Sequence, residues 1–298
     1  MQHDLPPTID PAAARRWAAR GHAVSPWLHE EVARRMAGRL DAIRLPVRCW
    51  AHWEPVRGGL AGHELVAAHY PAAEVLRVQA FAAAARPATE TQASPWWRRV
   101  GRTSAPAALA AVPDGAAQMV WANMLAHQVA DPLALLTDWQ RALATGGFVM
   151  FSCLGPDTLR QLRALYAGQG WPPPAQEFAG MREWGELLLA AGFADPVLDR
   201  EVLTLTFDTP ARLLAELREL GRNQHPGRHA ALRTPRWRQR LQAALDEHLR
   251  PAGGGPLQLT FEIIYGHALK APPRRAAGAI PLQEVRGQLR QRGDQSSQ

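Results

Sequence analysis

The sequence has very little cysteine and no long apolar run, and both absences exclude whole classes of protein. Cys49 and Cys153 are the only cysteines among 298 residues, too few for a disulfide framework or for a metal cluster built from cysteine alone. No metal site is predicted. No stretch of about 20 apolar residues occurs, so we expect no membrane span. The opening segment MQHDLPPTIDP also lacks the basic and apolar regions of a signal peptide. A reducing cytoplasm is the expected compartment.

Lysine is also nearly absent, so the formal net charge of +7 rests on arginine, with Lys270 as the only lysine. An arginine excess can indicate nucleic acid or an acidic protein partner. The simpler interpretation is a solvated surface together with a basic tail over residues 271–298. No basic module with interleaved aromatic residues is visible, so nucleic-acid binding is the less supported alternative.

Helix starts are clearly marked in this sequence. Four capping side chains stand directly before a proline, which is the preferred arrangement at a helix N-terminus: Asp10, Asp131, Thr209 and Thr234. From these starts and from the apolar spacing we predict helices at about 11–22, 26–42, 132–144, 181–191, 210–221 and 235–249.

Strands are predicted from short apolar runs and from alternation. Residues 147–153 and 118–123 are continuous apolar runs of the kind found in strands buried on both faces. Residues 257–269 alternate, with Leu257, Leu259, Phe261, Ile263 and Tyr265 on one side, and 74–78 form a weaker candidate. Helices that alternate with strands predict a layered α/β sheet.

The segment 119–163 resembles a known family. It contains a strand that ends in Ala122-Asn123, an Asp131-Pro132 helix start, a Gly146-Gly147 turn, an apolar strand, and the helix start Gly155-Pro156-Asp157-Thr158-Leu159. This order resembles the class I S-adenosylmethionine-dependent methyltransferases, and among them the malonyl-acyl-carrier-protein O-methyltransferases of biotin synthesis. Related complex I assembly methyltransferase-like proteins are similar too. The resemblance covers roughly 10–270.

The resemblance implies a Rossmann-like seven-stranded sheet with helices on both faces, in which the last strand is antiparallel. It implies a helical lead-in at 1–45, a methyltransferase-like domain at 46–270 with a helical insertion at about 207–250, and a disordered basic tail at 271–298. S-adenosylmethionine is the implied cofactor, lying across the carboxyl ends of the first strands.

The cofactor motif of the family is degenerate in this chain. A glycine-rich turn is expected near residues 50–58, where two tryptophans, a proline and an arginine stand instead. Gly58, Gly59 and Gly62 remain nearby, but their spacing is not that of the family's turn. Gln79 stands at the position where the family has an acidic residue that binds the ribose of the cofactor. Asp114 is the acidic residue nearest to the position expected to contact the adenine. Asn123 and Met124, which follow the next strand, complete the candidate cofactor contacts.

Four further residues are candidates for the acceptor side of the site. His127 could act as a general base or a carboxylate contact, or could be structural. Asp157 and Arg160 at a helix start, and Arg222 in the arginine-rich helical region, are candidate substrate contacts. Asp157 is also expected to cap its helix. The resemblance implies an acidic acyl carrier protein as partner, which an arginine-rich face would attract.

Two functional hypotheses follow. The first is a methyltransferase that acts on a free carboxylate in biotin synthesis. The second is a catalytically inactive protein of the same fold that binds or assembles with a partner. Trp50, Trp53, Trp96 and Trp97 could fill the cofactor's volume in the second case, or could be ordinary core and surface residues. Fold analogy alone does not decide between them.

Overall fold

The computed structural model describes residues 8–20, 24–79 and 112–272 and shows one six-stranded sheet among them. The strands lie in the order β2 (Glu74–Val78), β1 (Cys49–Trp53), β3 (Ala117–Ala122), β4 (Leu143–Leu154), β6 (Leu257–Leu269) and β5 (Ala194–Phe207). The first four strands pair in parallel, while β6 runs antiparallel to both of its neighbours. The predicted α/β class with an antiparallel last strand is confirmed.

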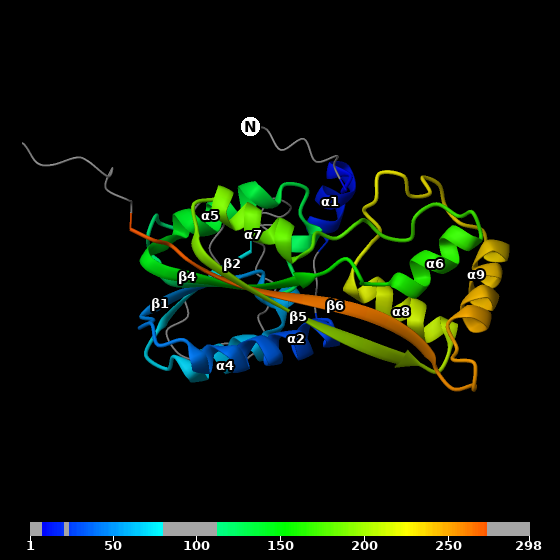
Figure 1. Cartoon of the computed structure of the whole chain (residues 1–298), viewed down its shortest axis with the longest axis horizontal. Coiled ribbons are helices and arrows are strands. Elements are labelled where there is room, and N and C mark those ends of the chain that lie inside the picture. The colour runs from blue at the N-terminus through cyan, green and yellow to red at the C-terminus, as the bar shows by residue number, and fades with distance from the viewer. Residues whose placement is uncertain (1–7, 21–23, 80–111, 273–298) are drawn as a thin grey trace, which may run out of the picture.

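Helices cover both faces of this sheet (Figure 1). Helices α2 (Trp27–Ala37) and α4 (Leu60–His69) lie on one face, and α5 (Pro132–Ala142) and α7 (Met181–Ala190) lie on the other. The remaining helical segments are α1 (Pro11–Ala18), η1 (Gly38–Ala42), α3 (Pro55–Gly58), η4 (Ala126–Gln128), α6 (Arg160–Gly168), α8 (Pro210–Leu220) and α9 (Pro235–His248). The predicted caps are confirmed, since all four side chains accept a backbone N–H in the first turn of their helix.

Three strand assignments differ from the sequence-based expectation. Strand β5 was not predicted, and a strand occupies residues 49–53, where the degenerate turn was expected to begin. The turn itself starts only at Glu54. A seventh strand is not among the described residues, and the chain between β2 and β3, residues 80–111, lies outside them together with Trp96 and Trp97.

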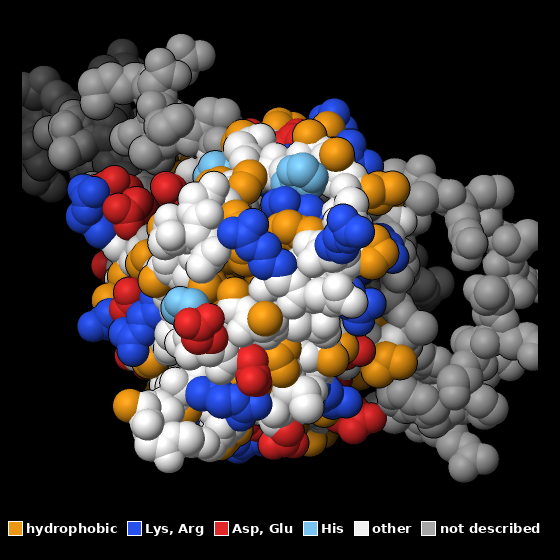
Figure 2. Space-filling view, turned by 90° about the vertical axis from the view of Figure 1, so that its right-hand side faces the viewer, with side chains coloured by type: hydrophobic (Ala, Val, Ile, Leu, Met, Phe, Trp, Pro, Cys, Tyr) orange, Lys and Arg blue, Asp and Glu red, His pale blue; other side chains and the backbone are white. Residues whose placement is uncertain are grey.

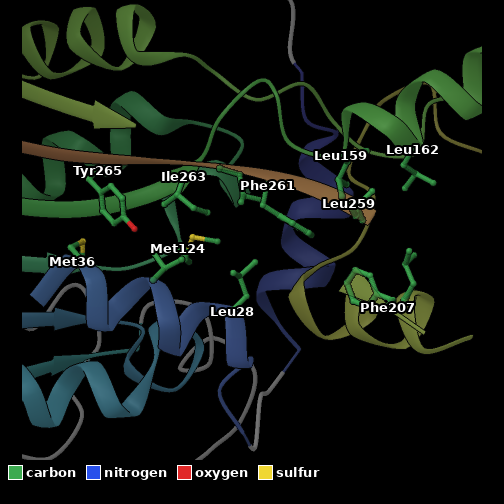
Figure 3. Packing of buried hydrophobic residues seen from close by; sticks show 14 of the residues in the cluster. Leu28, Met36, Met124, Leu159, Leu162, Phe207, Leu259, Phe261, Ile263 and Tyr265 are labelled. Atoms are coloured by element: carbon green, nitrogen blue, oxygen red, sulfur yellow. The ribbon is translucent and has the colours of Figure 1, made fainter. Parts of the chain in front are cut away.

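The core consists of two apolar layers, one on each face of the sheet. Trp50 and Trp53 point to opposite faces of β1 and are fully buried. Trp50 lies in the layer under α2, and Trp53 packs edge-on against Trp139 of α5, with ring centroids 6.2 Å apart. Both tryptophans are therefore ordinary core residues. Close packing continues along β6, where Ile263 and Phe261 face Leu28 of α2 (Figure 3).

Helices α6, α8 and α9 lie around the end of the sheet that the long strands β5 and β6 form, and α9 packs on both α6 and α8 (Figure 1). In the chain, α8 and α9 lie between β5 and β6, where the helical insertion was expected. Among the described residues no helix is long and apolar enough to cross a membrane, and no group of three potential metal ligands occurs.

Candidate functional site

A pocket of about 630 Å³ opens beyond the carboxyl ends of β3 and β4. Its walls come from α1, η4, α6, α8, α9 and β6, so it lies where the helical end of the molecule meets the sheet. Much of the lining is buried and apolar, including Leu159, Leu162, Leu241 and Phe261. Such a lining accommodates a hydrocarbon chain rather than a strongly hydrated group.

The outer part of this pocket carries positive charge. Arg218, Arg222, Arg233 and Arg238 line it, and none of them has a carboxylate at ion-pair distance among the described residues. Partial burial lowers the pKa of Arg222, to which the charges of Arg20 and Arg218 contribute further. Figure 2, a view onto this end of the molecule, shows basic side chains interleaved with hydrophobic ones. We name these four residues the arginine rim.

His127 lies in the inner wall of the pocket. It is 7% exposed, and its Nδ1 accepts a hydrogen bond from the Leu154 backbone N–H at 3.3 Å. Burial, with a smaller contribution from His29, lowers the pKa of His127 to about 3, so its imidazole is neutral near pH 7. A free carboxylate is already ionised at that pH and needs no general base. His127 is suited to a neutral hydrogen-bonding role.

Side chains of the turn after β1 are buried and bond to neighbouring parts of the protein. Arg57 is 5% exposed and points to the C-terminal end of α1, where its Nη2 donates to the carbonyls of Trp17, Ala18 and Arg20 at 3.1–3.3 Å. Trp17 in turn donates from Nε1 to Gln128 Oε1 at 2.6 Å and lines the pocket. This chain of contacts connects the β1 turn to the pocket wall.

The same turn is tied directly to the end of β3. Asn123 donates from Nδ2 to the carbonyls of Gly58 and His29, and its Oδ1 accepts from Ser152 Oγ at 2.6 Å. A side chain at Gly58 would approach the Asn123 carbonyl to 3.1 Å, and Gly59 has φ +108° against α2. These glycines therefore allow close packing between parts of the protein, and Asn123 uses its amide for that purpose.

Curated relatives identify the family. A malonyl-(acyl-carrier protein) O-methyltransferase of Gallionella capsiferriformans is 36% identical over 265 residues, covering 86% of this chain and 89% of the relative. The enzyme of the same name from Laribacter hongkongensis is 34% identical and covers 83% and 85%. The chain belongs to the malonyl-(acyl-carrier protein) O-methyltransferase family. No family model matches the sequence.

Solved structures confirm the fold. The YcgJ protein of Bacillus subtilis aligns with a TM-score of 0.52 at 12% identity, covering 80% of this chain and 99% of that one. A candidate methyltransferase of Bacillus halodurans aligns with a TM-score of 0.51 at 13% identity, with the same coverage. The chain therefore has the methyltransferase fold.

The family and its fold imply S-adenosylmethionine as methyl donor, but the described residues of the β1 turn do not fit it. The first amides of α4, which could receive an anionic ligand group, donate to Glu30: Leu60 N–H to Oε1 at 2.8 Å and Ala61 N–H to Oε2 at 2.9 Å. Pro55, Arg57 and Gly58 are buried within the protein. The one-turn helix α3 occupies the position of the glycine-rich turn that the family uses to bind the cofactor.

The predicted cofactor contacts do not converge on one site. Gln79 lies half-buried directly after β2, at the expected edge of the sheet. Asp114 precedes β3 and pairs with Arg141, so it lies at the opposite end of this strand from Asn123. Met124 is 1% exposed and points into the core near Leu28 and Ile263, as Figure 3 shows. The structure thus leaves Asp114 and Met124 without access to a common ligand.

The predicted substrate contacts are also only partly brought together. Arg222 lines the pocket with His127, whereas Asp157 and Arg160 are exposed and do not. The expected helix cap at Asp157 is wrong: helix α6 begins at Arg160 without a side-chain cap, because Asp157 lies in the preceding turn and donates its N–H to Glu262. Sequence reasoning missed Trp17, Gln128 and Gln224, which line the pocket but belong to no motif.

Proposed function

We propose that this chain binds the acyl group of an acyl carrier protein in the pocket beneath the arginine rim. The relatives' name states malonyl-(acyl-carrier protein) as their substrate. The pocket supports the same substrate class here, since its buried lining is largely apolar while its outer part is cationic. This combination suits a chain that is delivered by an acidic protein, and the chemistry of the pocket is the observation that carries the proposal.

The arginine rim supplies the attraction. Surface charges without a carboxylate partner act mainly on the rate of encounter and on its salt dependence. The carrier protein would approach over α8 and α9, and its acyl group would enter between these helices and α6. Binding in the cytoplasm is part of this proposal.

The test uses an acyl carrier protein loaded with a malonyl group and follows binding by calorimetry at two salt concentrations. The double variant Arg222→Ala/Arg238→Ala is expected to bind about tenfold more weakly at low salt, and less so at high salt. Arg236→Ala is the matched control, because Arg236 is exposed on the same helix as Arg238 but does not line the pocket. Equal affinities for the double variant and the wild type contradict the proposal.

A second candidate function is methyl transfer to the malonyl carboxylate, as the relatives' name describes. The family relationship over most of the chain favours it. The filled β1 turn favours binding without transfer. Calorimetry with S-adenosylmethionine, and mass spectrometry of the carrier protein after incubation with both, separate the two. A mass gain of one methyl group, or restored growth of a strain that lacks the biotin methyltransferase, establishes transfer.

A further inference from the structure

Gln224 is a buried polar residue of the pocket whose side-chain oxygen lacks a hydrogen-bond partner among the described residues. Its side chain is 1% exposed, and its Oε1 accepts no hydrogen bond from any described residue. Leaving such a buried acceptor unsatisfied destabilises the ligand-free state. Because Gln224 lines the pocket, a ligand in the pocket could satisfy it.

The backbone of Gln224 is held in place from both sides. Its N–H donates to Gln176 Oε1 at 3.2 Å, and its carbonyl accepts from the Asp10 N–H at 2.8 Å. Asp10 is itself fixed by an ion pair with Arg228 at 2.6 Å. The side chain therefore starts from a fixed backbone, as expected of a binding group whose position is set before the ligand arrives.

The pocket holds a second unsatisfied atom of the opposite kind. Trp237 of α9 also lines it, and its Nε1–H, a donor, has no partner among the described residues. An acceptor at Gln224 and a donor at Trp237 match the N–H and C=O of amide groups. A purely hydrocarbon chain would satisfy neither of these atoms.

We propose that the pocket takes a chain carrying amide groups, the pantetheine-like arm of a carrier protein, and that Gln224 Oε1 accepts a hydrogen bond from an amide N–H of that arm. The inference rests on the proposed function. It adds that the pocket recognises the arm of the carrier protein, while the arginine rim attracts the carrier protein itself. Methylene segments of the arm would lie against Leu162, Leu241 and Phe261, which line the same pocket.

The experiment compares three forms of one carrier protein: without an arm, with the natural malonyl-loaded arm, and with an arm in which esters replace the amides. An ester keeps the acceptor oxygens but has no N–H donor. We expect wild-type protein to bind the natural arm about fivefold more tightly than the ester arm, the effect of one hydrogen bond. In Gln224→Leu this preference should disappear, whereas the control Gln169→Leu, outside the pocket, should keep it.

The outcomes separate the inference from the proposed function. Equal binding of amide and ester arms by wild-type protein overturns the role of Gln224 even if the carrier protein binds well. Equal binding of the armless and loaded carriers overturns occupation of the pocket. Failure to bind any carrier form overturns the proposed function itself, and the inference with it. If Gln224→Leu does not fold, the wild-type comparison of amide with ester still decides.

Discussion

Replacing Arg57 with alanine should destabilise the protein strongly, because this side chain joins the β1 turn to helix α1. Its Nη2 donates to three carbonyls at 3.1–3.3 Å, and its guanidinium lies 5.2 Å from the Trp17 ring centroid. The three contacts share one nitrogen and are long, so we count them as one charged hydrogen bond of about 1.5–3 kcal/mol. The aromatic contact adds roughly 1 kcal/mol.

Burial of the charge acts in the opposite direction. Burial removes hydration from the Arg57 guanidinium, which lowers its pKa and offsets part of the favourable interaction. The net expectation is a loss of about 2–3 kcal/mol in the free energy of unfolding, measured by urea denaturation. Arg34→Ala is the matched control: its side chain is 61% exposed in a surface ion pair, so a loss below about 0.5 kcal/mol is expected.

A local readout makes this prediction sharper. Trp17 is buried in wild-type protein, so release of α1 in Arg57→Ala should shift tryptophan fluorescence and expose residues near the end of α1 to limited proteolysis. If Arg57→Ala and Arg34→Ala have the same stability and the same proteolysis pattern, the reasoning about the turn is refuted.

Three further variants test other parts of the structure. Asn123→Ala should lower the free energy of unfolding by about 2–4 kcal/mol, because it leaves buried partners of the amide unsatisfied; a value near zero in urea titration would contradict this. Gly62→Ala should cost about 1–3 kcal/mol despite its better helix propensity, because its Cβ would lie 2.5 Å from that of Ala33, whereas Gly168→Ala, with nothing within 4 Å, should be neutral or stabilising in thermal melts. The low pKa of His127 predicts that acid destabilises the protein. In the unfolded chain this imidazole is protonated below about pH 6.5, whereas in the folded protein it stays neutral down to about pH 3. The free energy of unfolding should therefore fall by about 1.4 kcal/mol per pH unit between these two values. His127→Phe should show a shallower fall between pH 6 and 4, with no titration-linked difference above pH 7; parallel curves would refute the assignment.

Most of the helices and strands that could be predicted were predicted from patterns within a few neighbouring residues. The four helix caps act within a few residues of the proline that follows each, so they are legible in the sequence and were confirmed. The strand predicted from the apolar alternation of residues 257–269 was also confirmed, because one side of β6 faces a continuous core layer. Strand β5 was missed because Asp195, Asp199, Arg200 and Glu201 interrupt its apolar pattern at the edge of the sheet.

The candidate site was less predictable, since its groups come from distant parts of the chain. Trp17 and Gln128 are 111 positions apart and meet only through folding. Gln224 belongs to no motif, and its unsatisfied oxygen becomes visible only when burial is known. The family motif correctly indicated that the glycine-rich turn is altered, but Trp50 was assigned to the turn although it lies in β1. Only tertiary structure distinguishes a core tryptophan from one that blocks a ligand.

The position of β6 has a consequence for synthesis of the chain. This strand lies between β4 and β5, so the edge of β4 and the whole of β5 have no partner strand until residues 257–269 have left the ribosome. Helices α8 and α9, which wall the pocket, are made before that strand. A nascent chain stalled near residue 250 would therefore leave β5 and the edge of β4 unpaired, and unpaired strand edges are sites where aggregation begins.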